Sequence, residues 1–174
     1  MDLALREQVY EVLLDAADSL YSTAYRFTGR ADVAEDAVQE TVRKAIQNIA
    51  HLRDKRKIRA WLFKILVNCV RDHFRRLQEW EQFAREAEVC EPCDLSLISR
   101  STAYDVERAL GRLSPARRAV VLLVDIEDFT LAEAADMLGI PPGTAASRLA
   151  RARDELRYVL RAYETRISEG GGPA

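Results

Sequence analysis

Cysteines, histidines and long apolar runs are scarce in this sequence, and each scarcity excludes a class of protein. Cysteine occurs three times in 174 residues, and an odd count provides no complete disulfide framework. No apolar run approaches the roughly 20 residues that a membrane-spanning helix needs. The amino-terminal stretch MDLALREQVY lacks the basic-then-apolar layout of a secretory signal peptide. These features predict a cytoplasmic protein without membrane insertion.

Histidine occurs only twice, as His51 and His73, and both lie in one basic segment. We find no pairing of a nucleophile with a base and no carboxylate cluster for a metal. Cys90 and Cys93 form a CxxC pair, which is compatible with half of a zinc site or with a redox disulfide. Zinc needs about four ligands, and no second CxxC or HxxxH accompanies the pair, which favours incidental cysteines. We expect a protein that is not an enzyme and that holds neither a metal nor a cofactor.

Glycine and proline are also few, at seven and five residues, and they cluster at a few places in the chain. Between these clusters apolar residues recur every three or four positions, as they do in amphipathic helices. A hydrophobic fraction of 48% is sufficient for packed cores, and the length allows one domain or two small ones. We predict an all-α protein with two small helical domains and an acidic, flexible linker. The predicted boundaries are 1–84 for the first domain, 85–101 for the linker, 102–166 for the second domain and 167–174 for a flexible tail.

The first two predicted helices have apolar faces that repeat at helical spacing. One follows apolar residues from Leu5 to Phe27 and ends near Gly29, and the next opens near Arg30 with Asp32 as a cap or first-turn acid. Small apolar residues on the second helix predict close packing. Its opposite face is acidic and polar, and is formed by Asp32, Glu35, Asp36, Gln39 and Glu40. Such a face is usually only solvated, but here it is also available to a partner.

The segment from His51 to Arg76 is strongly basic within an acidic chain. It holds nine lysine or arginine residues against two acids, a local charge of +7, whereas the whole chain carries −2. A cationic island of this kind predicts a polyanionic partner that binds at one place. The stretch from His51 to Lys57 has no periodicity and is predicted to be a loop. A helix follows from Ile58 and is expected to continue toward Trp80 or Phe83.

Polar and apolar residues separate on this basic helix. One stripe is formed at steps of four, three and four by Lys64, Asn68, Arg71 and Arg75. The other side is predicted to be core and consists of Leu62, Ile65, Leu66, Cys69 and Val70. Trp61 and Phe63 lie near the start of the helix, where a flat ring can meet an unstacked base. The alternative is a solvated basic face with two ordinary core aromatics.

A short helix, a turn and a second helix are predicted near the carboxyl end. Thr130 and Glu133 have the spacing of a capping box at the start of the short helix. Gly139 supplies the turn, and the next helix starts at about Pro142 and continues to about Tyr163.

The second helix of this pair carries Arg148 and Arg151 on one side. An arginine-rich helix after a glycine-centred turn is typical of a DNA-binding helix-turn-helix. The alternative is a small helical hairpin that binds no DNA.

Three stretches together resemble a known family. They are DVAEDAVQETVRKAI, IRAWLFKILVNCVRDHFRR and LGRLSPARRAVVLLVDIEDFTLAEAADMLGIPPGTAASRLARARDEL. In this order, and over roughly Leu20 to Leu160, the chain resembles the extracytoplasmic-function (ECF, group 4) sigma factors of bacterial RNA polymerase. The resemblance implies a region 2 helical bundle and a region 4 helix-turn-helix joined by the linker. It also implies an alternative sigma factor that binds core RNA polymerase, recognises -35 and -10 promoter elements and promotes DNA opening.

The resemblance assigns roles to the first domain. The acidic-polar face of the second helix would dock on the clamp helices of the polymerase β′ subunit, and the β flap is a further implied contact. Asn68 would recognise a flipped-out -10 base or its neighbour through its amide, with Trp61 and Phe63 bordering that base. The implied -10 contacts are Arg53, Lys55, Arg56, Lys57, Trp61, Phe63, Lys64, Asn68, Arg71 and Arg75. The acidic linker would thread the template channel and transcript exit path of the polymerase.

The resemblance also places the helix from Pro142 in the major groove of the -35 element. Its implied DNA contacts are Thr144, Ser147, Arg148 and Arg151. The chain departs from the family pattern at four positions, which are Val124 and Asp128 in a stretch that often reads LLRxxEG, and Ala146 and Ala150. Shorter side chains there predict a weaker or differently specified -35 recognition. An anti-sigma factor is a further implied partner.

Two other functions compete with this interpretation. A one-component transcription regulator explains the helix-turn-helix but leaves the basic helix of the first domain without a role. An adaptor that mimics a sigma factor predicts a receiver domain or the loss of the basic face, and neither is found. The combined motifs therefore favour a sigma factor over both alternatives.

Overall fold

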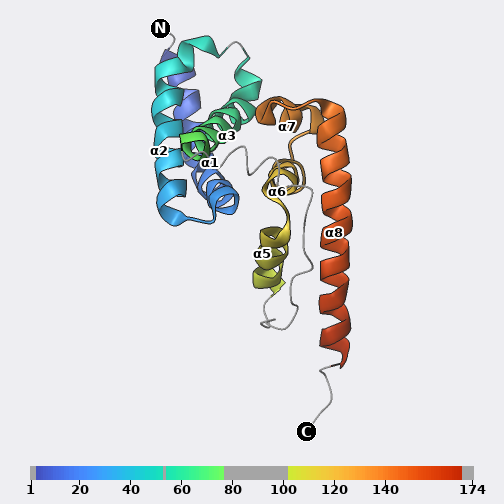
Figure 1. Ribbon diagram of the computed structural model, residues 1–174. Coiled ribbons are helices and arrows are strands. Elements are labelled where there is room, and N and C mark those ends of the chain that lie inside the picture. The colour runs from blue at the N-terminus through green and yellow to red at the C-terminus, as the bar shows by residue number, and fades with distance from the viewer. Residues whose placement is uncertain (1–2, 53, 77–101, 170–174) are drawn as a thin grey trace.

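The computed structural model describes residues 3–52, 54–76 and 102–169 of the chain. Every regular element in these ranges is helical, which confirms the all-α prediction (Figure 1). The linker predicted at 85–101, with its CxxC pair, lies outside the described residues. The same is true of the predicted extension of the basic helix toward Trp80.

The amino-terminal group consists of three helices that pack on one another. They are α1 (Leu3–Thr28), α2 (Ala31–Asn48) and α3 (Ile58–Arg76). Two 3-10 turns follow α2: η1 (Ile49–His51) ends where the predicted loop begins, and η2 (Lys55–Lys57) lies inside that loop. Each of the three helices contacts the other two, so the core of this group lies between them.

Gly29 ends α1 as predicted. Its φ of 67° is left-handed, a conformation that glycine adopts without a side-chain clash. Its N–H donates to the carbonyl of Tyr25 at 2.7 Å. Arg30 is the N-cap of α2 but makes no side-chain cap bond. Asp32 is therefore a first-turn acid rather than the cap, and it accepts a 2.6 Å hydrogen bond from Arg30.

Helix α2 approaches its neighbours closely because its buried face is built from small residues. Ala34, Ala37 and Ala45 are all buried. Thr41 is buried among them and donates its hydroxyl to the carbonyl of Ala37 at 2.7 Å. This bond satisfies the one polar side chain on the buried face.

The carboxyl-terminal group is built from four α-helices and one π-helical turn within the described residues. They are α5 (Thr102–Arg112), α6 (Pro115–Val121), the π turn η4 (Leu122–Ile126), α7 (Leu131–Leu138) and α8 (Pro142–Glu169). Helix α8 ends at Glu169 and is therefore longer than predicted. Its end was expected near Tyr163, and a flexible tail was expected from residue 167. The physical reason is that no glycine or proline lies between Gly143 and Gly170.

The predicted helix-turn-helix is confirmed at its caps. The backbone N–H of Glu133 donates to the Thr130 hydroxyl, and the backbone N–H of Thr130 donates to the Glu133 carboxylate at 3.0 Å. Gly139 ends α7 in the left-handed region with φ of 64°. The turn thus directs α8 across α7, against which it packs.

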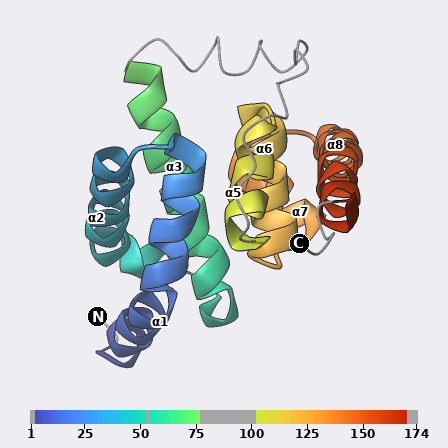
Figure 2. The ribbon, with the colours of Figure 1, turned by 90° about the horizontal axis from the view of Figure 1, so that it is seen from below.

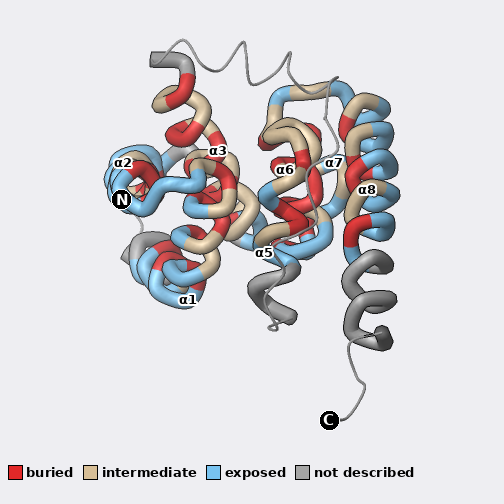
Figure 3. Tube along the Cα trace, turned by 60° about the horizontal axis from the view of Figure 1, so that its bottom comes forward, coloured by how far each residue is buried: buried red, intermediate tan, exposed pale blue. Residues whose placement is uncertain are grey.

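The two helical groups contact each other, which the sequence patterns did not predict. Helix α3 lies between α2 and α7, and both views show α2 and the carboxyl-terminal group on opposite sides of it (Figures 1 and 2). A single hydrophobic cluster contains residues of both groups. The outward surfaces of α2 and α8 are largely exposed (Figure 3).

Asp128 occupies the position that glycine holds in the LLRxxEG pattern. The backbone there has a conformation that glycine adopts more easily than other residues. Its φ of 56° is the one positive value for a non-glycine residue in the described ranges. The bend is fixed by two backbone bonds of 3.0 Å, from Glu127 to Leu122 and from Phe129 to Leu123. Because a side chain is strained in this region, we expect Asp128→Gly to raise the free energy of unfolding by about 0.5–1 kcal/mol. We expect Asp128→Ala to lower it.

Denaturant titration of the full chain measures both changes. Equal stability of the Asp128→Gly and Asp128→Ala variants would contradict the strain argument.

Candidate polymerase and nucleic-acid interfaces

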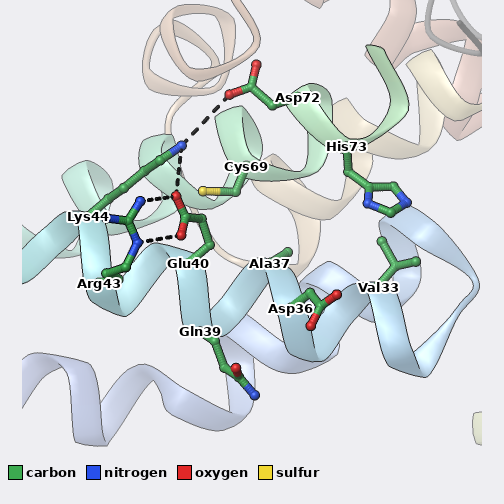
Figure 4. Close-up of a pocket in the computed structure, with 10 residues that line it drawn as sticks. All are labelled: Val33, Asp36, Ala37, Gln39, Glu40, Arg43, Lys44, Cys69, Asp72 and His73. Atoms are coloured by element: carbon green, nitrogen blue, oxygen red, sulfur yellow. Dashed lines mark hydrogen bonds and ion pairs between the residues drawn. The ribbon is translucent and has the colours of Figure 1, made fainter. Parts of the chain in front are cut away.

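The predicted acidic face lies on the outside of α2. Asp32, Glu35, Asp36 and Gln39 are exposed, and Glu40 is half-buried. The last three of these residues line a groove of about 670 Å³ between α2 and α3 (Figure 4). The structure thus brings the predicted polymerase-binding residues together on one accessible surface.

Charges within this groove are partly paired. The Arg43 guanidinium donates to both carboxylate oxygens of Glu40, at 2.7 Å for the Nε contact. These hydrogen bonds lower the pKa of Glu40 to about 2, so that carboxylate is ionised at neutral pH. Lys44 lies 3.6 Å from Glu40 and 3.8 Å from Asp72 (Figure 4). Asp36 makes no such contact with the other residues drawn and presents its charge outward.

Cys69 lines this groove but is itself buried, as predicted for a core residue (Figure 4). Burial raises the pKa of its thiol, so the side chain is not a reactive thiolate. In the described part of the chain no group of three His, Cys, Asp or Glu side chains could hold a metal ion.

On another side of α3, a second groove is lined by two lysines, an indole ring, three acids and apolar side chains. Lys57, Trp61 and Lys64 form one wall and residues of α7 the other, with a volume of about 520 Å³. Lys57 is exposed, whereas Trp61 and Lys64 are half-buried. Two cations and an indole ring, groups that bind single-stranded DNA elsewhere, thus lie at one opening together with the carboxylates of Asp54, Glu133 and Asp136.

One of the predicted -10 residues forms an ion pair with a neighbouring acid, and three others lie wholly or partly outside the described residues. Arg56 is exposed and forms a 3.1 Å ion pair with Asp54. Arg53 and the side chains of Lys55 and Arg75 lie outside the described residues. Their assignment to DNA stays a prediction.

Phe63 is fully buried in this conformation. Its ring meets that of Phe129 edge to face, with a centroid distance of 5.0 Å. Stacking of Phe63 on a base would therefore need a different arrangement of the two helical groups. The competing sequence interpretation, an ordinary core aromatic, describes Phe63 in this structure.

The polar stripe of α3 faces the second helical group. Lys64 forms a 2.7 Å ion pair with Asp136. Arg71 donates to the carbonyls of Leu138 and Met137 at 2.8 and 3.2 Å, where cations are favourable because α7 ends there. Asn68 lies between them on the stripe and is half-buried, with no hydrogen-bond partner in the described part of the chain.

Arg59 was not predicted as a site residue, although it is central to this face. It donates from Nη1 to the backbone carbonyl of Glu127 at 2.7 Å and from Nη2 to the Glu127 carboxylate at 2.6 Å. Its guanidinium also lies 4.9 Å from the ring centre of Phe63 and 4.5 Å from that of Phe129. The available sequence signal was the four-residue step from Arg59 to Phe63, which puts both on one helix face.

The predicted -35 residues lie at the start of α8. Arg151 and Ser147 are exposed, and Thr144 is half-buried. The Ser147 hydroxyl donates to the carbonyl of Thr144 at 3.0 Å. Arg148 is half-buried and lines a groove of about 260 Å³ that α3, α6 and α8 share with the end of α1. Arg148 is thus less accessible than Arg151 in this structure.

The two departures on α8 change the same surface. Ala146 and Ala150 are both exposed, next to Ser147 and Arg151. Alanine at these two positions contributes no side-chain donor or acceptor beside Ser147 and Arg151, which fits the predicted change in -35 recognition. No helix in the described ranges is long and apolar enough to cross a membrane.

Comparisons with known proteins match both helical groups. Residues 14–81 match the family model for Sigma-70 region 2, and residues 104–156 match the model for Sigma-70, region 4. The matches fall on the two groups seen in the structure.

Curated relatives cover most of the chain. It is 34% identical over 144 residues to the ECF RNA polymerase sigma factor SigM of Mycobacterium tuberculosis, covering 82% of this chain and 72% of SigM. It is 31% identical over 162 residues to EcfG of Rhodopseudomonas palustris, another ECF RNA polymerase sigma factor, covering 91% of this chain and 88% of EcfG.

Solved structures show the same fold. The sigma factor RpoE of Bartonella quintana, in complex with the anti-sigma factor NepR, matches with a TM-score of 0.69 and 27% identity. The match covers 87% of this chain and 96% of RpoE. CnrH, in complex with the cytosolic domain of CnrY, matches with a TM-score of 0.60 and 28% identity over 88% of each chain. With both regions matched in order, and with relatives above 30% identity over most of their length, this chain belongs to the ECF RNA polymerase sigma factors, which direct the initiation of transcription.

Proposed function

We propose that this sigma factor uses three separate surfaces during initiation. The exposed acidic face of α2 binds core RNA polymerase at the β′ clamp helices. The face formed by η2 and α3 binds the -10 element, and the start of α8 binds the -35 element. The observation that carries the proposal is the position of α3, which borders the groove of the acidic α2 face on one side and presents Trp61 and Lys64 on another.

The -10 contacts follow from the chemistry of the second groove. Lys57 and Lys64 suit phosphates, which supply affinity without sequence information. Trp61 offers a ring for stacking, and the amide of Asn68 both donates and accepts, so it can recognise a base edge. Phe63 packs beneath this surface and supports it.

The -35 contacts depend on the exposed part of α8. Arg151 and Ser147 lie on the accessible surface, and Thr144 lies in the first turn, where backbone N–H groups favour a phosphate. Arg148 becomes available when the groove that it lines opens. The two alanines between these side chains predict that fewer -35 bases are contacted.

The implied partners and location follow the same family. RpoE of Bartonella quintana was solved with an anti-sigma factor, and we propose an anti-sigma factor for this chain as well. We propose that it acts in the cytoplasm, where it joins the polymerase. Sigma factors are non-enzymatic initiation factors, and on this proposal bond formation belongs to the polymerase.

A charge reversal on α2 tests the polymerase surface. We expect Asp36→Lys to weaken association with core RNA polymerase roughly tenfold or more, because it reverses an exposed charge at the centre of the proposed acidic contact. The control Asp15→Lys makes the same charge change at an exposed site on α1. Competition binding against the wild-type chain measures both variants. Equal affinity of Asp36→Lys and wild type would place the polymerase surface elsewhere.

A further inference from the structure

The groove that Arg148 lines combines apolar walls with positive charge. Its volume of about 260 Å³ is close to the lower end of the range for small-molecule sites, about 300 Å³. Two arginines line it, and none of the described side chains around it is acidic. Apolar side chains of both helical groups form most of the walls, among them Phe27, Val70 and Phe74 of the first group and Pro115, Ala119 and Ile140 of the second.

The two arginines of the groove differ in their partners. Arg71 donates to the carbonyls of Leu138 and Met137 at 2.8 and 3.2 Å. Arg148 is half-buried, yet within the described ranges it takes part in neither a hydrogen bond nor an ion pair. A charge that is partly withdrawn from water is costly unless an opposite charge lies beside it. The guanidinium of Arg148 therefore favours an anion in the groove.

We propose that this groove binds a small carboxylate with an apolar tail. The carboxylate pairs with Arg148, whose planar guanidinium can donate two parallel hydrogen bonds to it. The second cation, Arg71, adds to the positive potential of the groove. The tail packs between the apolar side chains of α3 and α6, and the small volume favours a tail of medium length over a long one.

The ligand also competes with DNA. One guanidinium cannot pair with a ligand carboxylate and with the -35 element at the same time, so the bound ligand removes Arg148 from promoter recognition. This consequence rests on the proposed -35 role of Arg148, whereas binding of the ligand does not. Because the ligand binds only the folded chain, it also raises the Tm.

Calorimetric titration of the full chain with octanoate tests the site. We expect one octanoate per chain, with a Kd on the order of 1 mM or tighter for a ligand of this size. Two further probes separate the charge from the tail, since 1-octanol has the tail without the charge and acetate has the charge without the tail. We expect each to bind at least about tenfold more weakly than octanoate, because each lacks one of the two contacts.

Three variants locate the bound octanoate. Arg148→Gln breaks no hydrogen bond in the described part of the chain, and we expect it to bind octanoate about tenfold to hundredfold more weakly. Arg151→Gln is the matched control, because it makes the same change at an exposed position of α8 outside the groove. Its affinity for octanoate should equal that of the wild-type chain. Ala116→Phe keeps Arg148 but fills the groove from α6, so the folded variant should also lose binding.

Three results would overturn the proposal. They are the absence of octanoate binding to the wild-type chain, equal affinity for 1-octanol and octanoate, and equal affinity of Arg148→Gln and wild type for octanoate. Wild-type chain that fails to bind octanoate but still directs transcription would refute only the ligand site.

Titration with a fluorescent pool of random-sequence duplex DNA separates this proposal from the proposed function. Saturating octanoate should weaken DNA binding by the wild-type chain to the level of Arg148→Gln, and should leave Arg148→Gln itself unchanged. If octanoate binds as expected but does not alter the DNA affinity of the wild-type chain, the ligand site stands and the proposed DNA contact of Arg148 fails.

Discussion

Asn68→Ala should lower the yield of open promoter complexes about tenfold to hundredfold, because a good amide contact to a base edge discriminates by about 1–3 kcal/mol. Asn68 lies on the α3 stripe between Lys64 and Arg71, and its amide has no partner among the described residues. Its loss therefore breaks no hydrogen bond in the described part of the folded chain. The affinity for core polymerase should be unchanged, because α2 is untouched.

Probing of unpaired promoter bases in the reconstituted holoenzyme measures this effect. Asn48→Ala is the matched control, since it makes the same truncation at the exposed end of α2. Unchanged opening by Asn68→Ala, with duplex binding also unchanged, would remove Asn68 from the -10 site.

Phe63→Ala should lower the free energy of unfolding by about 3–5 kcal/mol, the usual range for removing a buried phenylalanine. Phe63 is 0% exposed and packs against Phe129, so the change leaves a cavity between the two helical groups. A loss of this size is comparable to the total stability of a small domain. Phe63→Leu keeps most of the volume and should cost less than about 1.5 kcal/mol.

Denaturant titration of both variants decides between the two interpretations of Phe63. A large stability loss for alanine and a small one for leucine supports a core role. A fully stable Phe63→Ala variant that opens promoters poorly would instead show that Phe63 contacts DNA and that its burial contributes little to the stability of the fold.

Local features of the fold could be predicted from the sequence because neighbouring residues determine them. The capping box of Thr130 and Glu133 and the turns at Gly29 and Gly139 depend only on residues within one or two helical turns. The exposed acidic face of α2 follows from periodicity alone. The structure confirms the capping box, the two glycine turns and the exposed face of α2.

The contact between the helical groups could not be predicted in this way. Glu127 and Arg59 are 68 residues apart, and no periodic pattern specifies which faces of two amphipathic groups meet. Glu127 looks like one more surface acid in a strongly acidic stretch, yet it is buried. Phe63 likewise fits both a core and a stacking role until Phe129 is placed beside it. Long-range pairing of this kind decides which predicted DNA contacts are accessible.

Transcription by core RNA polymerase reconstituted with the wild-type chain is the most direct test of the central claim. The templates are a promoter library with random sequence upstream of a common reporter region. We predict that the chain directs initiation on a subset of templates that share two short elements at a fixed spacing, and that core enzyme alone does not. Transcription no greater than that of core enzyme alone, on every template, would contradict the claim.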